Sequence, residues 1–400
     1  MIERSSRQTL LRLARGFPIV AVTGPRQAGK TTLARQCFPD KPYLSLEDPD
    51  VLALAESDPR GLLAAHADGA IIDEAQRAPQ LFSYLQTRVD EQRAPGAWIL
   101  TGSQQFGLLS GITQSLAGRV GMLQLLPFAI PEVRAAGRLP ASLEELLVQG
   151  FYPPLYDRPV ASGDWFASYV ATYVERDVRQ LINVRDLSAF QRFVKMCAAR
   201  TAQLLNLSAL AADCGITHNT AAAWVSVLEA SYLVHLLRPH HRNFNKRLVK
   251  TPKLYFHDVG LAAWLLGVRE PEQARFHAQR GALFETLVVN ELLKRQLNDA
   301  QPSNLFFWRD SKGLEIDVLI ESGDDLTPVE IKSGQTVAPD FFTGLKQWLA
   351  LSGNPWHPAW LIYGGDREHR RENVGIIPWN HLPTQPSAGS IECCEGQGSG

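Results

Sequence analysis

The sequence has 400 residues, of which 45% are hydrophobic and 20% charged. This length excludes a single small module and is typical of a globular chain of two or three domains. The 40 Lys and Arg residues balance 41 Asp and Glu residues, so a net charge of -1 excludes a general attraction to nucleic acid or to anionic membranes.

No segment of the sequence has the features of a leader or of a membrane span. Met1–Arg15 mixes arginines with apolar residues, whereas a signal peptide has an uninterrupted apolar core. No run approaches the roughly 18 consecutive apolar residues that a membrane-spanning helix needs. The 5 cysteines are too few for a disulfide framework. We therefore expect a cytoplasmic protein that makes no membrane contact.

The region 1–130 alternates short β-branched runs with helix-like segments, which predicts a parallel α/β sheet buried on both faces. Between a strand expected at 19–23 and a helix beginning at Lys30, the sequence fits G-x-x-x-x-G-K-[ST]. Glycines let such a loop wrap around phosphate, Lys30 can reach the terminal phosphates of ATP, and the Thr31 hydroxyl can ligate Mg²⁺. The residues predicted to bind ATP in this loop are Gly24, Pro25, Arg26, Gln27, Ala28, Gly29, Lys30, Thr31 and Thr32.

Polar residues end two further expected strands. An apolar run leads into Asp73 and Glu74, at the edge where open parallel sheets bind ligands. We predict that Asp73 helps to hold Mg²⁺ and that Glu74 orients or deprotonates the attacking water. The alternative for such an acidic pair is a helix cap or a solvated turn. After the third strand, Ser103 or Gln104 can sense the γ-phosphate or position water.

Arg119 precedes the next apolar run. It is a candidate for stabilising transition-state charge, either in its own chain or across the interface of a homo-oligomer. A surface arginine without such a role is the alternative.

Several motifs together resemble a known family. They are GPRQAGKTT at 24–32, IIDEAQ at 71–76, LTGS at 100–103, SLAGR at 115–119 and TYVERD at 172–177. The sequence resembles the bacterial and archaeal AAA-type ATPases that carry the domain of unknown function numbered 4143, over nearly the whole chain. The resemblance implies an AAA-type ATPase core, a winged helix and a C-terminal restriction-endonuclease-like domain. Gln104 departs from the family, whose members often carry Asn or another small residue there.

The region 131–186 has a mostly helical pattern typical of a lid or connector. In 187–270, two short helices flank a turn and two strand-like runs follow, which predicts a winged helix-turn-helix. From Arg238 to Lys253 there are 6 Lys and Arg residues and no Asp or Glu. Such a strip indicates contact with DNA phosphates rather than with base edges, and the alternative is a packing module with a solvated basic loop. The residues predicted to contact DNA are Arg238, Arg242, Lys246, Arg247 and Lys250.

In 271–382 we expect a helix at 281–296 and strands at 314–320 and 328–331. The alternation of these strands places Asp317, Glu330 and Lys332 on one face if the strands pair. The two carboxylates can hold Mg²⁺ while Lys332 assists hydrolysis, and Glu285 on the helix can supply a third metal ligand. This set is similar to that of the restriction-endonuclease-like superfamily. A solvated strand, or a domain that keeps these residues for structure or binding, is the alternative.

These features predict an α/β chain with a P-loop NTPase sheet of AAA type, a winged helix and a nuclease-like domain. The predicted boundaries are 1–130, 131–186, 187–270, 271–382 and a disordered tail at 383–400. The predicted function is ATP hydrolysis with Mg²⁺, coupled to DNA binding or processing. The alternative is a nucleotide-regulated signalling or scaffold switch whose nuclease-like domain is an inactive binding module.

Overall fold

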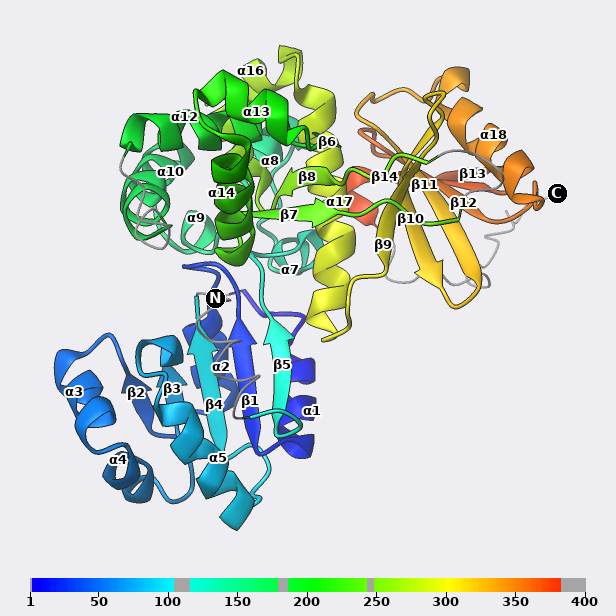
Figure 1. Cartoon of the computed structure of the whole chain (residues 1–400). Coiled ribbons are helices and arrows are strands. Elements are labelled where there is room, and N and C mark those ends of the chain that lie inside the picture. The colour runs from blue at the N-terminus through cyan, green and yellow to red at the C-terminus, as the bar shows by residue number, and fades with distance from the viewer. Residues whose placement is uncertain (1, 104–115, 179–185, 243–247, 383–400) are drawn as a thin grey trace. The chain divides into compact units, whose positions relative to one another are not determined.

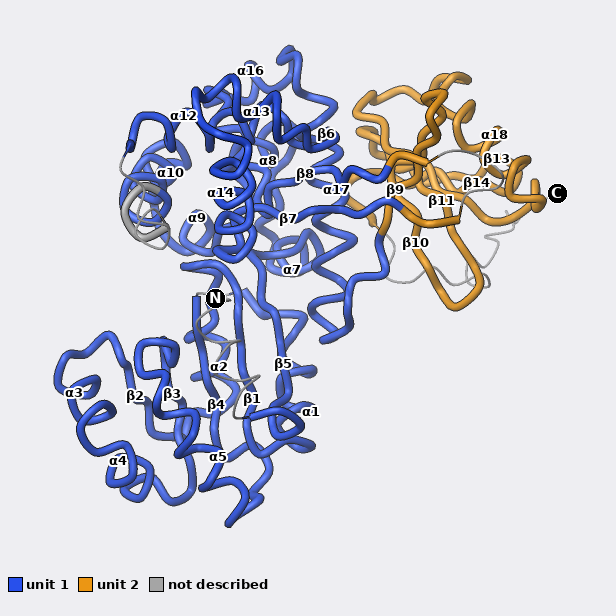
Figure 2. The backbone as a smooth tube through the Cα atoms, viewed as in Figure 1, with its two compact units in different colours: residues 1–239, 250–305 blue, residues 240–249, 306–400 orange. Residues whose placement is uncertain are grey.

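The computed structural model describes residues 2–103, 116–178, 186–242 and 248–382 (Figure 1). The predictions for Gln104, Lys246, Arg247 and the tail at 383–400 lie outside these residues. The chain forms two compact units: unit 1 comprises 1–239 and 250–305, and unit 2 comprises 240–249 and 306–400 (Figure 2). Within the described ranges, none of the helices combines the length and the apolar content that a membrane span requires.

A five-stranded sheet forms the N-terminal part of unit 1, in the order β2-β3-β4-β1-β5, and its neighbouring strands pair in parallel. Ile19 and Ala21 of β1 pack in one apolar cluster with α3, α4 and α5, whereas Val20 and Val22 pack in another with α1 and α2. Helices thus cover both faces, and the predicted parallel α/β sheet is confirmed. The strands are β1 (Ile19–Thr23), β2 (Tyr43–Ser45), β3 (Ile71–Asp73), β4 (Trp98–Gly102) and β5 (Val120–Gln124), and the helices are α1 (Arg7–Gly16), α2 (Lys30–Cys37), α3 (Pro49–Ser57), α4 (Pro59–Ala65), η1 (Ala75–Arg77) and α5 (Leu81–Glu91).

The carboxyl ends of these strands lie along one edge of the sheet. Thr23 of β1 lies opposite Gly102 of β4, and Ser45 of β2 lies opposite Asp73 of β3. The loops that follow β1, β3 and β4 therefore leave the sheet together, at the edge where parallel sheets bind ligands.

The remainder of unit 1 is mostly helical, with a three-stranded antiparallel sheet in the order β6-β8-β7. The predicted pair of short helices is present: α13 ends at Gly215, whose left-handed φ of 68° turns the chain, and Thr217 caps α14 by accepting from the Thr220 N–H. The elements are α7 (Ile130–Ala135), α8 (Leu143–Gln149), α9 (Pro154–Asp157), α10 (Ser162–Tyr169), η2 (Val170–Val178), α12 (Leu187–Ala198), β6 (Gln203–Leu204), α13 (Leu207–Cys214), α14 (His218–Ala230), β7 (Val234–Leu237), β8 (Lys253–Phe256), α15 (Val259–Leu265), α16 (Pro271–Phe276) and α17 (Arg280–Asn298).

Helix α17 belongs to unit 1, although its sequence begins the region predicted as the C-terminal domain. Asn290 of α17 donates to the Phe256 carbonyl of β8 at 2.6 Å, and Arg280 forms an ion pair with Glu144 of α8 at 2.8 Å. These contacts explain why the boundary between the compact units follows α17 rather than preceding it.

Unit 2 contains a six-stranded mixed sheet in the order β13-β14-β12-β11-β10-β9. The predicted strands are present as β10 and β11, which pair antiparallel, and α18 packs its apolar residues against the sheet. Two residues between the predicted wing strands β7 and β8 lie along β9, because His240 N–H donates to the Phe307 carbonyl at 2.7 Å and Val249 N–H to the Arg309 carbonyl at 3.0 Å. The elements are β9 (Leu305–Arg309), β10 (Glu315–Ser322), β11 (Asp325–Lys332), η3 (Pro339–Phe342), α18 (Thr343–Ser352), β12 (Ala359–Tyr363), β13 (His369–Arg371), β14 (Val374–Pro378) and η4 (Trp379–His381).

Candidate functional site

The loop after β1 wraps tightly because glycine occupies two demanding positions. Gly24 has a φ of 146°, and a Cβ there would lie 1.9 Å from the Leu125 carbonyl oxygen. Gly29 has a φ of 91° and stands at the N-cap of α2. The first N–H groups of α2 therefore open towards the loop, where the helix dipole favours an anion.

Lys30 is the buried cation of this loop, with 5% of its surface exposed. Its Nζ donates to the carbonyl oxygens of Gly24 at 3.0 Å and Pro25 at 2.8 Å. Burial lowers the pKa of Lys30 to about 8, and the negative charges of Glu74 and Asp73 oppose that shift. An anionic phosphate beside Lys30 would favour the charged form, so phosphate binding and protonation of Lys30 are linked.

The Asp73 carboxylate accepts hydrogen bonds from hydroxyl groups on three neighbouring elements. Thr31 Oγ1 lies 3.0 Å from both carboxylate oxygens, Tyr43 donates to Oδ2 at 2.7 Å, and Thr101 also donates to this carboxylate. Burial, followed by this contact with Asp73, raises the pKa of Tyr43 to about 12. Since Mg²⁺ prefers hard oxygen ligands, the adjacent Thr31 hydroxyl and Asp73 carboxylate fit such a cation. Neither Tyr43 nor Thr101 was among the site residues predicted from the sequence.

Glu74 follows Asp73 in an unusual backbone conformation, with a left-handed φ of 53°. Its Oε2 accepts from Ser103 Oγ at 2.9 Å and from the Gln76 side-chain amide. Ser103 is 3% exposed, and its contact with Glu74 is partly buried. The structure thus places the two predicted residues Glu74 and Ser103 together, and it adds Gln76.

A cleft of about 540 Å³ lies beside these residues. One wall belongs to the sheet and the phosphate loop, and it includes Arg26, which forms an ion pair with Glu47 at 2.8 Å. The opposite wall comes from the helical part of unit 1, for which the sequence analysis predicted only a lid or connector. The motif at 172–177 could have indicated this wall from the sequence, because its first two residues, Thr172 and Tyr173, line the cleft. The lining residues are Arg26, Gln27, Gly29, Lys30, Thr31, Thr32, Glu47, Asp73, Glu74, Pro153, Pro154, Asp157, Arg158, Tyr169, Thr172 and Tyr173.

A second group of charged side chains lies on β10 and β11 of unit 2. The pairing of these strands extends over Val318–Ser322, and next to it Asp317 Oδ2 accepts from the Ile331 N–H at 2.8 Å. Lys332 Nζ lies 2.6 Å from Glu330 Oε1, and Glu330 is 7% exposed. The predicted strand residues therefore lie near one another, and each carboxylate already has a partner within the unit.

Protein-family models match three parts of the chain. An AAA domain matches residues 16–134, and two domains of unknown function match residues 140–272 (DUF8612) and 280–382 (DUF4143). The proteins Rv2008c of Mycobacterium tuberculosis and Mb2031c of Mycobacterium bovis are each 31% identical to this chain over 398 residues, which is 98% of this chain and 87% of each relative. The chain belongs to the AAA-type ATPases that carry the DUF4143 domain.

Two solved structures are similar to this AAA-type ATPase at a low level. The Walker-type ATPase PABY2304 of Pyrococcus abyssi is 15% identical, with a TM-score of 0.45 over 66% of this chain and 96% of that chain. A RuvB variant of Thermotoga maritima is 16% identical, with a TM-score of 0.30 over 59% of this chain and 90% of that chain.

Arg119 of the ATPase lies at the opposite edge of the sheet from the phosphate loop. It directly precedes β5, which runs parallel to β1, so a strand length of roughly 16 Å separates it from the carboxyl edge. Its guanidinium forms an ion pair with Asp90 at 2.7 Å. A role for Arg119 in the nucleotide site of its own chain is therefore wrong, and action on a neighbouring subunit stays a prediction.

Glu285 has partners that the sequence analysis did not anticipate. Its Oε1 lies 2.9 Å from Lys253 Nζ and accepts from the Tyr255 hydroxyl at 2.6 Å. Glu285 belongs to unit 1, whereas Asp317 and Glu330 belong to unit 2. In the described parts of the chain, no three His, Cys, Asp or Glu side chains are grouped to hold a metal ion, and Glu285 has its partners within unit 1.

The strip of six cations is likewise not continuous. Lys253 is 3% exposed and faces Glu285, so its assignment to an exposed strip was wrong. Arg238, Arg242 and Lys250 are exposed. Arg242 belongs to unit 2, where its carbonyl accepts from Trp308 Nε1 at 2.8 Å.

Proposed function

We propose that this chain hydrolyses ATP in the cleft beside the phosphate loop and couples the nucleotide state to DNA. The observation that carries the first part is the position of Thr31 Oγ1, 3.0 Å from the carboxylate of Asp73, next to the buried Lys30. A hydroxyl, a carboxylate and an ammonium group at the start of a helix can together bind a nucleoside triphosphate and its metal ion.

Each residue has a distinct part in the proposed reaction. The N–H groups at the start of α2 and the ammonium group of Lys30 bind and orient the phosphates, and Thr31 and Asp73 would hold Mg²⁺, which offsets phosphate charge when bound. Glu74 accepts the proton of the attacking water or orients it, after exchanging its contact with Ser103 for the water. Because Ser103 and Gln76 hold Glu74 before ligand binds, they are candidates for setting when it becomes available.

Phosphate release by the full chain tests this part of the proposal. Turnover should require Mg²⁺ and should stop when EDTA removes it. Turnover that is equal with and without a divalent cation, or absent in both conditions, would contradict the assignment of Thr31 and Asp73.

The DNA-related part of the proposal rests on the predicted winged helix. The order α12, β6, α13, α14, β7, β8 is the order of elements expected for that fold, and His218 and Asn219 are exposed at the N-terminus of α14. Recognition helices contact DNA with this end. The exposed cations Arg238 and Lys250 flank the two wing strands and would add phosphate contacts.

Salt dependence of binding tests this part. We expect duplex or branched DNA to bind at low salt, with log Kd rising as log salt concentration rises, and Arg238→Gln with Lys250→Gln should reduce the slope by about 0.9 for each lost contact. Lys195→Gln, at an exposed position of α12, is the matched control and should leave the slope unchanged.

We further propose that Asp317, Glu330 and Lys332 are the residues of a nuclease-like site that holds a divalent cation with two carboxylates. Asp317→Asn should abolish any metal-dependent cleavage of DNA. Cleavage that persists in this variant would exclude the site.

One observation favours the second candidate function, a nucleotide-regulated switch that contacts protein. His240 and Val249, which lie between the two predicted wing strands, are hydrogen-bonded to β9 in unit 2, and the cation Lys253 is paired with Glu285 inside unit 1. Absence of binding to duplex, single-stranded and branched DNA at low salt, with and without ATP, would decide for the switch.

A further inference from the structure

Arg4 lies directly behind the phosphate loop, with 6% of its surface exposed. Its Nη1 donates to the carbonyl of Ala28, inside the loop, at 2.7 Å. Its Nη2 donates to the carbonyl of Leu126 at 2.6 Å, and its Nε lies 3.2 Å from Glu132 Oε1. The guanidinium therefore joins the loop to the segment 126–132, and a planar fork of donors suits such a position.

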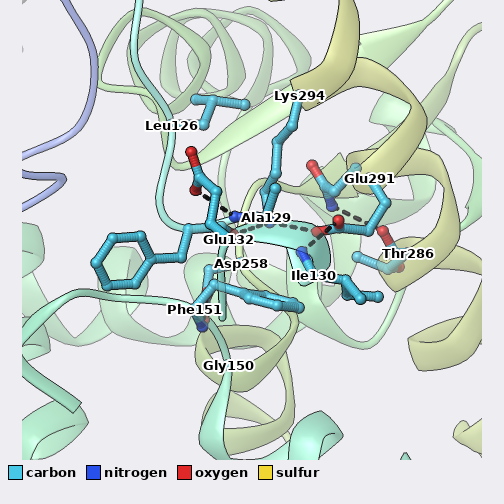
Figure 3. Close-up of polar contacts among 12 residues, drawn as sticks. Leu126, Ala129, Ile130, Glu132, Gly150, Phe151, Asp258, Thr286, Glu291 and Lys294 are labelled. Atoms are coloured by element: carbon cyan, nitrogen blue, oxygen red, sulfur yellow. Dashed lines mark hydrogen bonds and ion pairs between the residues drawn. The ribbon is translucent and has the colours of Figure 1, made fainter. Parts of the chain in front are cut away.

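The same segment is held on its other side by α17. Ile130 N–H donates to Glu291 Oε2 at 2.7 Å (Figure 3). Lys294 Nζ donates to the Phe128 carbonyl at 2.7 Å. Glu291 and Lys294 also form an ion pair at 2.8 Å, and their side chains are only 3% and 2% exposed. Buried charges are costly unless they are paired, so this pair fixes the segment in one position.

The start of the phosphate loop depends on the same segment. Leu125 N–H donates to the Thr23 carbonyl at 2.7 Å, and the Leu125 carbonyl packs against Gly24. The region 125–132 thus touches the loop at its start directly and at Ala28 through Arg4. Any displacement of this region would change the shape of the loop.

We infer that Arg4 is a positioning residue for the ATP site, and that the buried pair Glu291–Lys294 makes the loop sensitive to the position of α17. This inference rests on the proposed ATPase activity. Arg4 touches no reacting atom; it acts through the Ala28 carbonyl, so its loss should weaken ATP binding more than it slows the chemical step. Helix α17 begins the DUF4143 match and leads into β9, so the pair would link nucleotide binding to the start of unit 2.

The first test compares KM, kcat and the thermal unfolding midpoint of arginine variants. Arg4→Gln should raise KM for ATP about tenfold with kcat within about threefold of wild type, and Arg4→Lys should lie between. Arg7→Gln, which removes only an exposed ion pair with Glu3 at 3.9 Å, should match wild type. Val89→Ala, in the buried face of α5 and away from the segment 126–132, controls for general destabilisation.

An unchanged KM in Arg4→Gln, in a wild type that hydrolyses ATP, would overturn the inference. So would an equal rise in KM in Val89→Ala at the same loss of unfolding midpoint. If Arg4→Gln does not fold, Arg4→Lys carries the comparison, since it keeps the buried charge. A wild type without Mg²⁺-dependent turnover would instead contradict the proposed ATPase activity.

A double-mutant cycle on ATP Kd tests the link to α17. Glu291→Gln with Lys294→Met neutralises the pair together and should raise Kd about threefold. When this change is combined with Arg4→Gln, the fold-increase in Kd should be about threefold smaller than the product of the two separate fold-increases, because both changes act through the segment 126–132. Arg280→Gln removes the ion pair that α17 makes with Glu144, away from that segment, and should combine with Arg4→Gln as a simple product. A simple product for the Glu291–Lys294 variant as well would overturn the link.

Discussion

The phosphate loop in unit 1 and the charged group on β10 and β11 in unit 2 use the same residue types, a lysine beside strand carboxylates. In unit 1, Thr31, Asp73 and Lys30 converge on a cleft whose far wall comes from the helical part of the same unit. In unit 2, Asp317 accepts a backbone N–H and Glu330 pairs with Lys332. The carboxylates of both sites have partners, but those of the first site, Asp73 and Glu74, are held by neutral hydroxyl and amide groups beside a cleft of about 540 Å³, whereas Glu330 of the second is paired with the charged Lys332. A similar residue pattern therefore does not imply an equally complete site.

The largest expected effect is the loss of Lys30. Lys30→Ala should lower kcat/KM for ATP by about 100-fold or more, because one buried, preorganised donor to phosphate is removed. Lys346→Ala is the control, since the Lys346 side chain is 64% exposed on α18. If Lys30→Ala turned over ATP at a rate within a few-fold of wild type, the phosphate loop would not be a more complete site than the charged group of unit 2.

Thr31 should have the next largest effect. Thr31→Ala should raise the Mg²⁺ concentration needed for half-maximal turnover by about tenfold or more, whereas Thr31→Ser keeps the hydroxyl and should recover most of the loss. A magnesium titration of ATP turnover measures both. If serine and alanine behave alike, the hydroxyl is not a metal ligand.

The pH dependence of ATP affinity is a further property that distinguishes the phosphate loop from the charged group of unit 2. It is expected because the ammonium group of Lys30 is buried. Its pKa is lowered to about 8, so the ammonium group is present below that pH and is lost as pH rises through it. ATP affinity should therefore fall above pH 8, by up to about tenfold per pH unit. Removing the negative charge in Glu74→Gln should move the onset to lower pH, since Glu74 opposes the shift. An affinity independent of pH between 7 and 10 would contradict this role of Lys30.

The smallest effect is expected when the charged group of unit 2 is altered. Asp317→Asn with Glu330→Gln should leave Mg²⁺-dependent ATP turnover within about twofold of wild type, because the ATP site is complete within unit 1. Phosphate release in matched buffers is the measurement. A loss comparable to that of Lys30→Ala would mean that the two sites work as one.

Sequence reasoning located the phosphate loop because its residues are contiguous, and because strand ends of a parallel sheet meet at one edge. It also predicted β10, β11 and the pair of short helices, since apolar periodicity reports them directly. Contacts between distant segments could not be predicted from local patterns. Arg4 donates hydrogen bonds to the carbonyls of Ala28 and Leu126, and Glu291 accepts one from the Ile130 N–H.

Lys253 and Glu285 illustrate the same limit. The sequence analysis placed the lysine in a DNA-binding strip and the glutamate in a metal site, and the structure makes them partners at 2.9 Å. Each residue matched a plausible local pattern, but a charged side chain inside a fold needs an opposite charge or hydrogen-bond partners. That requirement depends on tertiary packing, which neither local pattern contains.

The most direct test of the central claim is a comparison of ATP binding and ATP turnover in Glu74→Gln. We expect a Kd for ATP within a few-fold of wild type at pH 7 and a kcat reduced by about 100-fold or more, because the glutamate acts on the water and not on the bound phosphates. A variant that binds ATP and hydrolyses it at the wild-type rate would contradict the assignment of this cleft as the hydrolytic site.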